Sequence, residues 1–126
     1  MALVLGPIGQ IGFAVSDVDR AEDFYGGKLG LRKLFRFGTL SFYDCAGVRL
    51  LLDQAADSKA VQGGSPVYFR VPDIALARRE LESRGVSFVD EIHLIAPMED
   101  HDLWMTFFRD PEENLLALMC EMPKVG

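Results

Sequence analysis

The sequence predicts an α+β fold built from two βαβββ modules. Three observations predict it: a strand-like segment that recurs, an aspartate after each copy that can cap a helix, and further strand-like runs after each helix. Residues 8–17 alternate with a period of two, as a half-buried strand does. Residues 67–73 repeat this pattern about 56 positions later, with Asp73 in the place of Asp17. The recurrence indicates two copies of one supersecondary unit.

Each of these segments leads into a helical pattern. Asp17 is placed to cap a helix over residues 17–29, and Gly30 is placed to end it. Asp73 is placed to cap a second helix, over residues 73–84. The apolar positions at helical spacing are Ala21, Phe24, Tyr25 and Leu29 in the first helix and Ile74, Ala77 and Leu81 in the second.

Three strands are predicted to follow each helix. In the first half they cover residues 33–37, 40–43 and 48–52. In the second half they cover 87–89 with an extension to 95, then 104–109 and 115–119. Residues 54–65 are rich in Ala, Asp, Ser and Gly and are the predicted linker. We therefore expect a single domain over residues 1–126, with modules at about 7–54 and 64–122.

Composition and charge narrow the classes of partner. The chain has 126 residues, 49% of them hydrophobic, which is enough for one domain with its own core. Thirteen basic against nineteen acidic side chains give a net charge of −6 and a pI near 4.8. Because an acidic surface repels phosphate backbones, this excludes nucleic acid as the expected partner. A neutral or cationic small organic ligand fits better.

Cysteine content and hydropathy predict a cytoplasmic protein. Cys45 and Cys120 are the two cysteines and form no CxxC pair, which is typical of a reducing compartment. Residues 1–7 lack the basic flank of a signal peptide. The strongest apolar run, residues 115–120, is far shorter than the roughly 20 residues that a membrane span needs.

Three segments resemble the vicinal oxygen chelate superfamily, which includes glyoxalase I, bleomycin-resistance proteins and extradiol dioxygenases. They are residues 8–17, residues 21–31 with Ala-Glu-Asp-Phe-Tyr and Leu-Gly-Leu, and the turn Phe-Arg-Asp-Pro-Glu-Glu-Asn at 108–114. The resemblance implies that the two modules form an open, cup-shaped mixed sheet with the helices on its convex side. It also implies that substrate, and in many members a divalent metal, bind in the cup.

The family's metal-ligand positions fall on Gln10, Leu50, Pro66 and Ala117 when they are carried over by the resemblance. Only Gln10 has a side chain that could ligate a metal. Because transition metals need three or four N, O or S ligands, we expect no metal at this position and no cofactor.

Two histidines and several strand arginines are the other residues that could carry chemistry. His93 and His101 lie in an acidic segment, where a neighbouring carboxylate could orient an imidazole as a base or complete a relocated metal site. The alternative is that both are merely solvated. Arg49, Arg70 and Arg109 interrupt apolar strands and need a carboxylate, either within the protein or on a ligand.

These considerations predict a small-molecule-binding homodimer that has lost the family's metal site. The predicted ligand-binding residues are Gln10, Tyr68, Arg70, His101, Met105 and Phe107. The alternative is a lyase-like or dioxygenase-like enzyme with a non-standard site that uses Gln10, His93 and His101. A third possibility is a regulatory or assembly module without a ligand. The catalytic residues and the identity of the ligand stay open.

Overall fold

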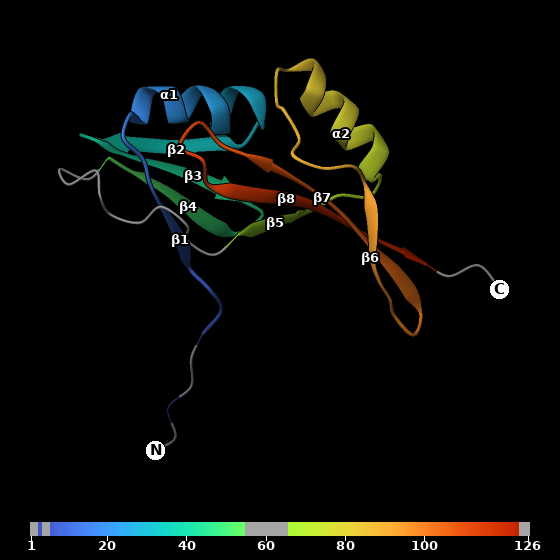
Figure 1. Ribbon diagram of the computed structural model, residues 1–126. Coiled ribbons are helices and arrows are strands. Elements are labelled where there is room, and N and C mark those ends of the chain that lie inside the picture. The colour runs from blue at the N-terminus through green and yellow to red at the C-terminus, as the bar shows by residue number, and fades with distance from the viewer. Residues whose placement is uncertain (1–2, 4–5, 55–65, 124–126) are drawn as a thin grey trace. The chain divides into compact units, whose positions relative to one another are not determined.

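The computed structural model of the chain describes residues 3, 6–54 and 66–123 (Figure 1). The chain divides into two compact units, Met1–Val61 and Gln62–Gly126. Apart from Gln54, the predicted linker lies outside the described residues. Each unit contains one four-stranded mixed sheet and one helical segment, so the predicted α+β fold of two βαβββ modules is confirmed.

The first module has strand order β1-β4-β3-β2, with β1 parallel to β4 and the other neighbours antiparallel. Its elements are β1 (Gln10–Ala14), α1 (Val18–Glu22), the π-helix η1 (Asp23–Lys28), β2 (Arg32–Phe37), β3 (Leu40–Cys45) and β4 (Val48–Asp53). The second module has the same arrangement, with order β5-β8-β7-β6 and β5 parallel to β8. Its elements are β5 (Val67–Arg70), α2 (Ile74–Ser83), β6 (His93–Pro97), β7 (His101–Arg109) and β8 (Leu115–Pro123).

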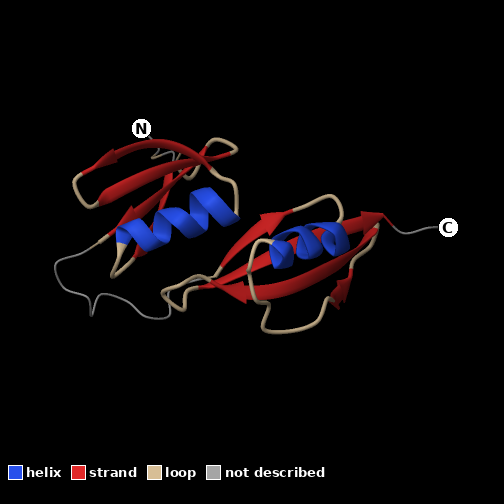
Figure 2. Ribbon diagram, turned by 90° about the horizontal axis from the view of Figure 1, so that it is seen from above, coloured by secondary structure: helices blue, strands red, loops and turns tan. Residues whose placement is uncertain are grey.

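Each helix covers one face of its own sheet (Figure 2). Side chains alternate between the two faces of a strand, and the buried strand positions, apart from Ala117, are those beneath the helices. In the first module these are Phe13, Ser41, Tyr43, Leu50 and Leu52, and in the second Thr106, Phe108, Leu116, Leu118 and Cys120. We call the opposite side of each sheet its open face.

The two predicted capping aspartates do cap the helices. The Asp17 carboxylate accepts a hydrogen bond from the backbone N–H of Arg20 at 3.1 Å, and Asp73 accepts one from Leu76 at 3.0 Å. Gly30, at φ +73°, adopts the left-handed conformation that glycine tolerates best at a helix end. None of the described helices is long and apolar enough to cross a membrane.

The first helix widens into a π-helix, which the helical spacing did not predict. At Gly26 the segment lies so close to the sheet that an added Cβ would be 3.2 Å from the Tyr43 ring. A Cβ at Gly27 would meet nothing within 4 Å. Gly26 is therefore the position that sets how closely this segment approaches the sheet.

All three strands predicted after the second helix were wrong at their boundaries, and β8 extends to Pro123 instead of ending at residue 119. Residues 87–89 form only one bridge, Phe88 to Phe108, and the strand begins later, at His93. The Asp90 carboxylate accepts a hydrogen bond from the backbone N–H of Phe107 at 2.8 Å, so a side chain takes the place of a ladder bond there. β7 begins at His101, which places that histidine on a strand and not in a loop.

Candidate functional site

The open face of the second sheet gathers five of the six predicted ligand-binding residues. The strand register places Tyr68 beside Ala117 and Ala117 beside Phe107, all on this face. The next row along the strands contains Arg70, Met119, Met105 and His93. Because alternate residues of a strand share a face, Glu121 and His101 extend the same surface.

Two aromatic rings form one end of this surface. The Tyr68 and Phe107 rings meet edge to face with centroids 6.0 Å apart, on the two strands that flank β8. Between them lies Ala117, which is fully buried, while 43% of Tyr68 is exposed. The small side chain of Ala117 leaves room for the two rings to meet above it.

A charged network forms the other end. Nη2 of Arg70 donates a hydrogen bond to Oε1 of Glu121 at 2.9 Å. Oε2 of the same carboxylate lies 3.4 Å from Nε2 of His101, whose Nδ1 lies 2.6 Å from Oδ1 of Asp100. A recess of about 330 Å³ adjoins the Arg70–Glu121 pair. The network thus joins a guanidinium, two carboxylates and an imidazole through consecutive contacts.

His93 has a defined tautomer. Its Nδ1 lies 2.8 Å from the backbone carbonyl oxygen of Glu91, which only accepts hydrogen bonds, so Nδ1 carries the proton. The Asp90 carboxylate lies 3.6 Å from the same nitrogen. In the neutral ring Nε2 is then an acceptor. The imidazole stacks on Phe107 at 6.4 Å, which places it at the aromatic end of the open face.

Gln10, the sixth predicted residue, lies on the open face of the first sheet. Its side-chain oxygen Oε1 accepts a hydrogen bond from Nε of Arg49 at 2.7 Å. The Arg49 guanidinium lies 5.4 Å from the centre of the Phe42 ring, and Phe42 stacks on Phe35 at 4.4 Å. This surface therefore presents the Gln10 amide and the Arg49 guanidinium beside two stacked aromatic rings.

The strand register corrects the ligand position that the sequence placed at Leu50. Leu50 pairs with Ile11 and is buried beneath the helix, only 2% exposed. In the second module Tyr68 pairs with Ala117, and in the first Gly12 pairs with Leu51. Leu51 is thus the counterpart of Ala117, one residue away from the predicted position. An off-by-one error of this kind moves a side chain to the other face of the sheet.

The donor set does not fit a metal ion. With this correction the four positions hold Gln10, Leu51, Pro66 and Ala117, of which only Gln10 has a donor side chain. No group of three His, Cys, Asp or Glu side chains within residues 6–54 and 66–123 is close enough to bind a metal. In that part of the chain His93 and His101 therefore form no relocated site with their acidic neighbours.

Sequence reasoning missed Glu121 and Asp90, which hold the two histidines. Glu121 lies beyond the predicted end of its strand, although its spacing of two from Met119 could have placed it on the open face. No sequence pattern indicates the role of Asp90, because its partners depend on where β7 lies in the folded chain. Of the other candidates, Arg109 donates to the Glu113 carbonyl within its own turn. Both cysteines are free thiols, and burial raises the pKa of Cys45, so that thiol is not activated.

Known proteins with this fold share little sequence with the chain. A glyoxalase/bleomycin resistance protein/dioxygenase from Alicyclobacillus acidocaldarius has a TM-score of 0.73 at 20% identity, over 90% of each chain. Lactoylglutathione lyase from Agrobacterium tumefaciens has a TM-score of 0.72 at 21% identity, over 93% of this chain and 95% of that one. A putative glyoxalase family protein from Bacillus anthracis has a TM-score of 0.74 at 17% identity, over 96% and 99%.

At these identities the structures establish the fold and not the activity. No curated protein matches the sequence with significance. The family profile of the Glyoxalase/Bleomycin resistance protein/Dioxygenase superfamily, in contrast, matches residues 7–118, which is nearly the whole chain. The chain belongs to the glyoxalase/bleomycin resistance protein/dioxygenase superfamily.

Proposed function

We propose that this protein binds a small organic molecule on the open face of the second sheet, without a metal at the family's usual position. One observation carries the metal-free part of the proposal. Oε1 of Gln10, the single donor at the family positions, lies 2.7 Å from a guanidinium nitrogen of Arg49. A divalent cation at that oxygen would lie beside the positive charge of the Arg49 guanidinium, which repels it. Gln10 thus accepts a hydrogen bond within its own sheet and does not act as a metal ligand.

The ligand chemistry follows from the two ends of the open face. Tyr68 and Phe107 offer ring faces and edges to a flat or apolar group. Arg70, Glu121 and His101 offer both signs of charge to a polar group. A ligand with an apolar body and one cationic or hydrogen-bonding end matches the two ends of the open face, because a cation can bind the Glu121 carboxylate alongside Arg70. Met105 lies between the two ends.

A thermal-shift screen of small organic molecules tests the binding part. Since a ligand that binds only the folded state stabilises it, a specific binder at 100 times its Kd should add about 2.7 kcal/mol. Arg70→Met and His101→Gln should each weaken a binder found in this way about tenfold, for a charged contact of about 1.4 kcal/mol. Arg79→Met, which removes an exposed arginine of α2, is the matched control. Equal affinity for all three variants would refute this assignment of the site.

Metal content tests the metal-free part independently. Protein prepared without chelators or a metal-affinity tag should contain far less than one equivalent of Zn, Ni, Fe or Mn per chain. Close to one equivalent that disappears in Gln10→Ala would overturn the proposal. One equivalent lost only in His93→Gln or His101→Gln would instead establish the relocated site.

An enzyme that transfers protons is the second candidate, and the tautomer of His93 favours it. Nδ1 is held by the Glu91 carbonyl and faces the Asp90 carboxylate, so Nε2 has the arrangement of a general base. Asp90→Asn removes the carboxylate that faces Nδ1 of His93. We expect Asp90→Asn and His93→Gln each to lower the kcat of any proton-transfer activity at least about tenfold, whereas Arg79→Met should leave it unchanged. Equal kcat in all three variants would count against this candidate.

We also propose that the protein is a homodimer. Phe35 and Phe37 on the edge strand β2 are 50% and 74% exposed, and an exposed apolar edge favours pairing with another chain. Light scattering at micromolar concentration should give about twice the chain mass of 14.0 kDa. A value near the chain mass would refute the dimer.

A further inference from the structure

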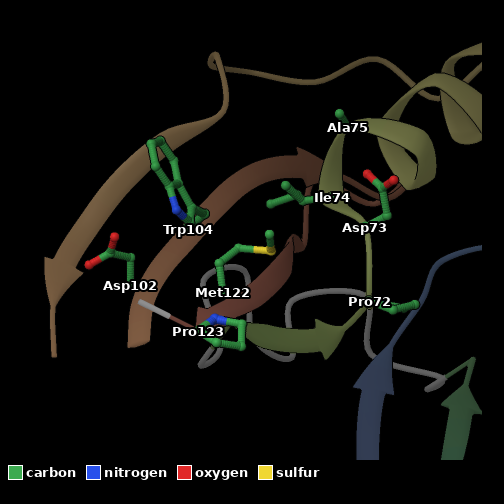
Figure 3. A pocket seen from close by; sticks show the side chains of 8 residues that line it. All are labelled: Pro72, Asp73, Ile74, Ala75, Asp102, Trp104, Met122 and Pro123. Carbon is green, nitrogen blue, oxygen red and sulfur yellow. The ribbon is translucent and has the colours of Figure 1, made fainter. Parts of the chain in front are cut away.

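A groove lies on the helix side of the second module, away from the open face (Figure 3). It runs between the first turn of α2 and the ends of β7 and β8, and its volume is about 900 Å³. It is lined by Pro72, Asp73, Ile74, Ala75, Asp102, Trp104, Met122 and Pro123. Asp102 and Trp104 alternate along β7 with Leu103 and Met105, so they leave the sheet on the side opposite the proposed ligand site.

The floor of the groove is apolar and aromatic. Figure 3 shows the side chains of Trp104 and Met122 side by side, with Ile74 across from them at the start of α2. Ile74 is buried, whereas 47% of Met122 is exposed. Trp and Met are side chains that give large, adaptable contact area to an organic ligand. These side chains gather in a concave surface instead of standing singly on a convex one, which is typical of a binding site.

Among the described residues, the charged groups that line this groove are two aspartates, at its opposite ends. Asp73 is the capping residue of α2 and accepts the N–H of Leu76, so the positive end of the helix offsets its charge. Asp102 lies on β7, two residues from Trp104 on the same face of the strand. Asp102 thus places a carboxylate at the indole end of the groove.

We propose that this groove binds an organic cation that carries an alkylated ammonium group. The ammonium would lie against the Trp104 indole, the ring that attracts cations best, with Asp102 as its counter-ion. The apolar remainder would extend along Met122 toward Ile74. Alkylated ammonium groups need few or no hydrogen-bond acceptors, which suits a site of one ring, one thioether and one carboxylate. The net charge of −6 also favours a cation over an anion.

The single tryptophan of the chain reports directly on this groove. Titration with benzyltrimethylammonium should change the Trp104 emission saturably. Neopentylbenzene, which has a carbon in place of the charged nitrogen, should change it at least fivefold less at equal concentration. Asp102→Asn should raise the apparent Kd of the cation about fivefold, as expected for a partly exposed charge contact of about 1 kcal/mol.

Glu99→Gln is the matched control, because it removes the same charge from the β6–β7 turn without lining the groove. Its Kd should stay within twofold of that of the unchanged protein, and thermal unfolding should show that both variants fold. Arg70→Met should also leave the Kd unchanged, which separates this site from the proposed function. The proposal is overturned by emission that does not saturate, by equal binding of the neutral compound, or by equal weakening in Asp102→Asn and Glu99→Gln. Calorimetric titration of Trp104→Phe gives a second test, since unchanged affinity would also overturn it.

Discussion

Glu22 and Arg78 occupy the same position in the two modules, 56 residues apart, and carry opposite charges. Glu22, at the end of α1, accepts a hydrogen bond from the Ser41 hydroxyl at 2.7 Å and pairs with Lys33 at 2.8 Å. Arg78, in α2, donates to the Thr106 hydroxyl at 2.7 Å. Their side chains are only 17% and 14% exposed. Both helices thus hold a charged group against their sheet.

The difference shows that the repeat fixes the backbone and not the chemistry. A charge beneath a helix is tolerated in either sign if the sheet supplies its partner. In the first module the partners come from β2 and β3. In the second, Arg78 also donates to the backbone carbonyl of Asp90 at 2.6 Å and lies over the Phe88 ring at 4.7 Å. Asp90 also lies beside His93. Arg78, on the helix side of the sheet, is therefore connected through Asp90 to a histidine on the open face.

The largest effect on stability is expected from removing the Arg78 charge. Arg78→Met keeps the aliphatic stem but leaves the Asp90 carbonyl and the Thr106 hydroxyl without their charged donor. We expect the free energy of unfolding to fall by about 3 kcal/mol in chemical denaturation. Hydrogen exchange at the Phe107 amide, which is held by Asp90, should accelerate with it. Arg79→Met, next to it and exposed, should change stability by less than about 0.5 kcal/mol. Equal effects of the two variants would show that the network is not stabilising.

The close approach at Gly26 distinguishes the first helix from the second, where Glu82 stands at the same position of the repeat. Gly26→Ala should destabilise the protein by about 2 kcal/mol, since the buried Tyr43 ring has little room to move. Gly27→Ala, in open space on the same π-helix, should be neutral or stabilise by up to about 1 kcal/mol. Thermal unfolding of the two variants tests this prediction. A Gly26→Ala variant as stable as the unchanged protein would mean that Tyr43 and its strand can move to make room for the added Cβ.

The smallest effect is expected from Glu22, and it depends on pH. Burial raises the pKa of this carboxyl, but the hydrogen bonds of Lys33 and Ser41 and the charges of Lys33 and Arg36 outweigh burial and lower it below 4.5. The charged form therefore stabilises the fold above about pH 5, and this contribution is lost as the pH falls through the lowered pKa. Glu22→Gln should cost about 1 kcal/mol at about pH 7 and nothing at about pH 2.5, measured by denaturation at both pH values. A difference independent of pH would refute the charge as its cause.

The sequence predicted the helix caps and the shared face because both depend on local geometry. Asp17 and Asp73 bond to amides three residues away, and Tyr68 and Arg70 share a face because a strand has a period of two. The period also placed Met105 with Phe107. The sequence could not predict Leu51 in place of Leu50, because the register between β1 and β4 is set by packing beneath the helix.

What the sequence by itself determined is the two-module α+β frame, because repetition, capping and periodicity act over a few residues each. Only the tertiary structure decided which side chains meet across strands. It joined Gln10 to Arg49, Glu121 to both Arg70 and His101, and Asp90 to His93. Except for Asp90 and His93, these partners are 20 to 51 residues apart in the sequence. Such contacts depend on strand register and on charges that must find a partner once they leave water, and no local pattern encodes either.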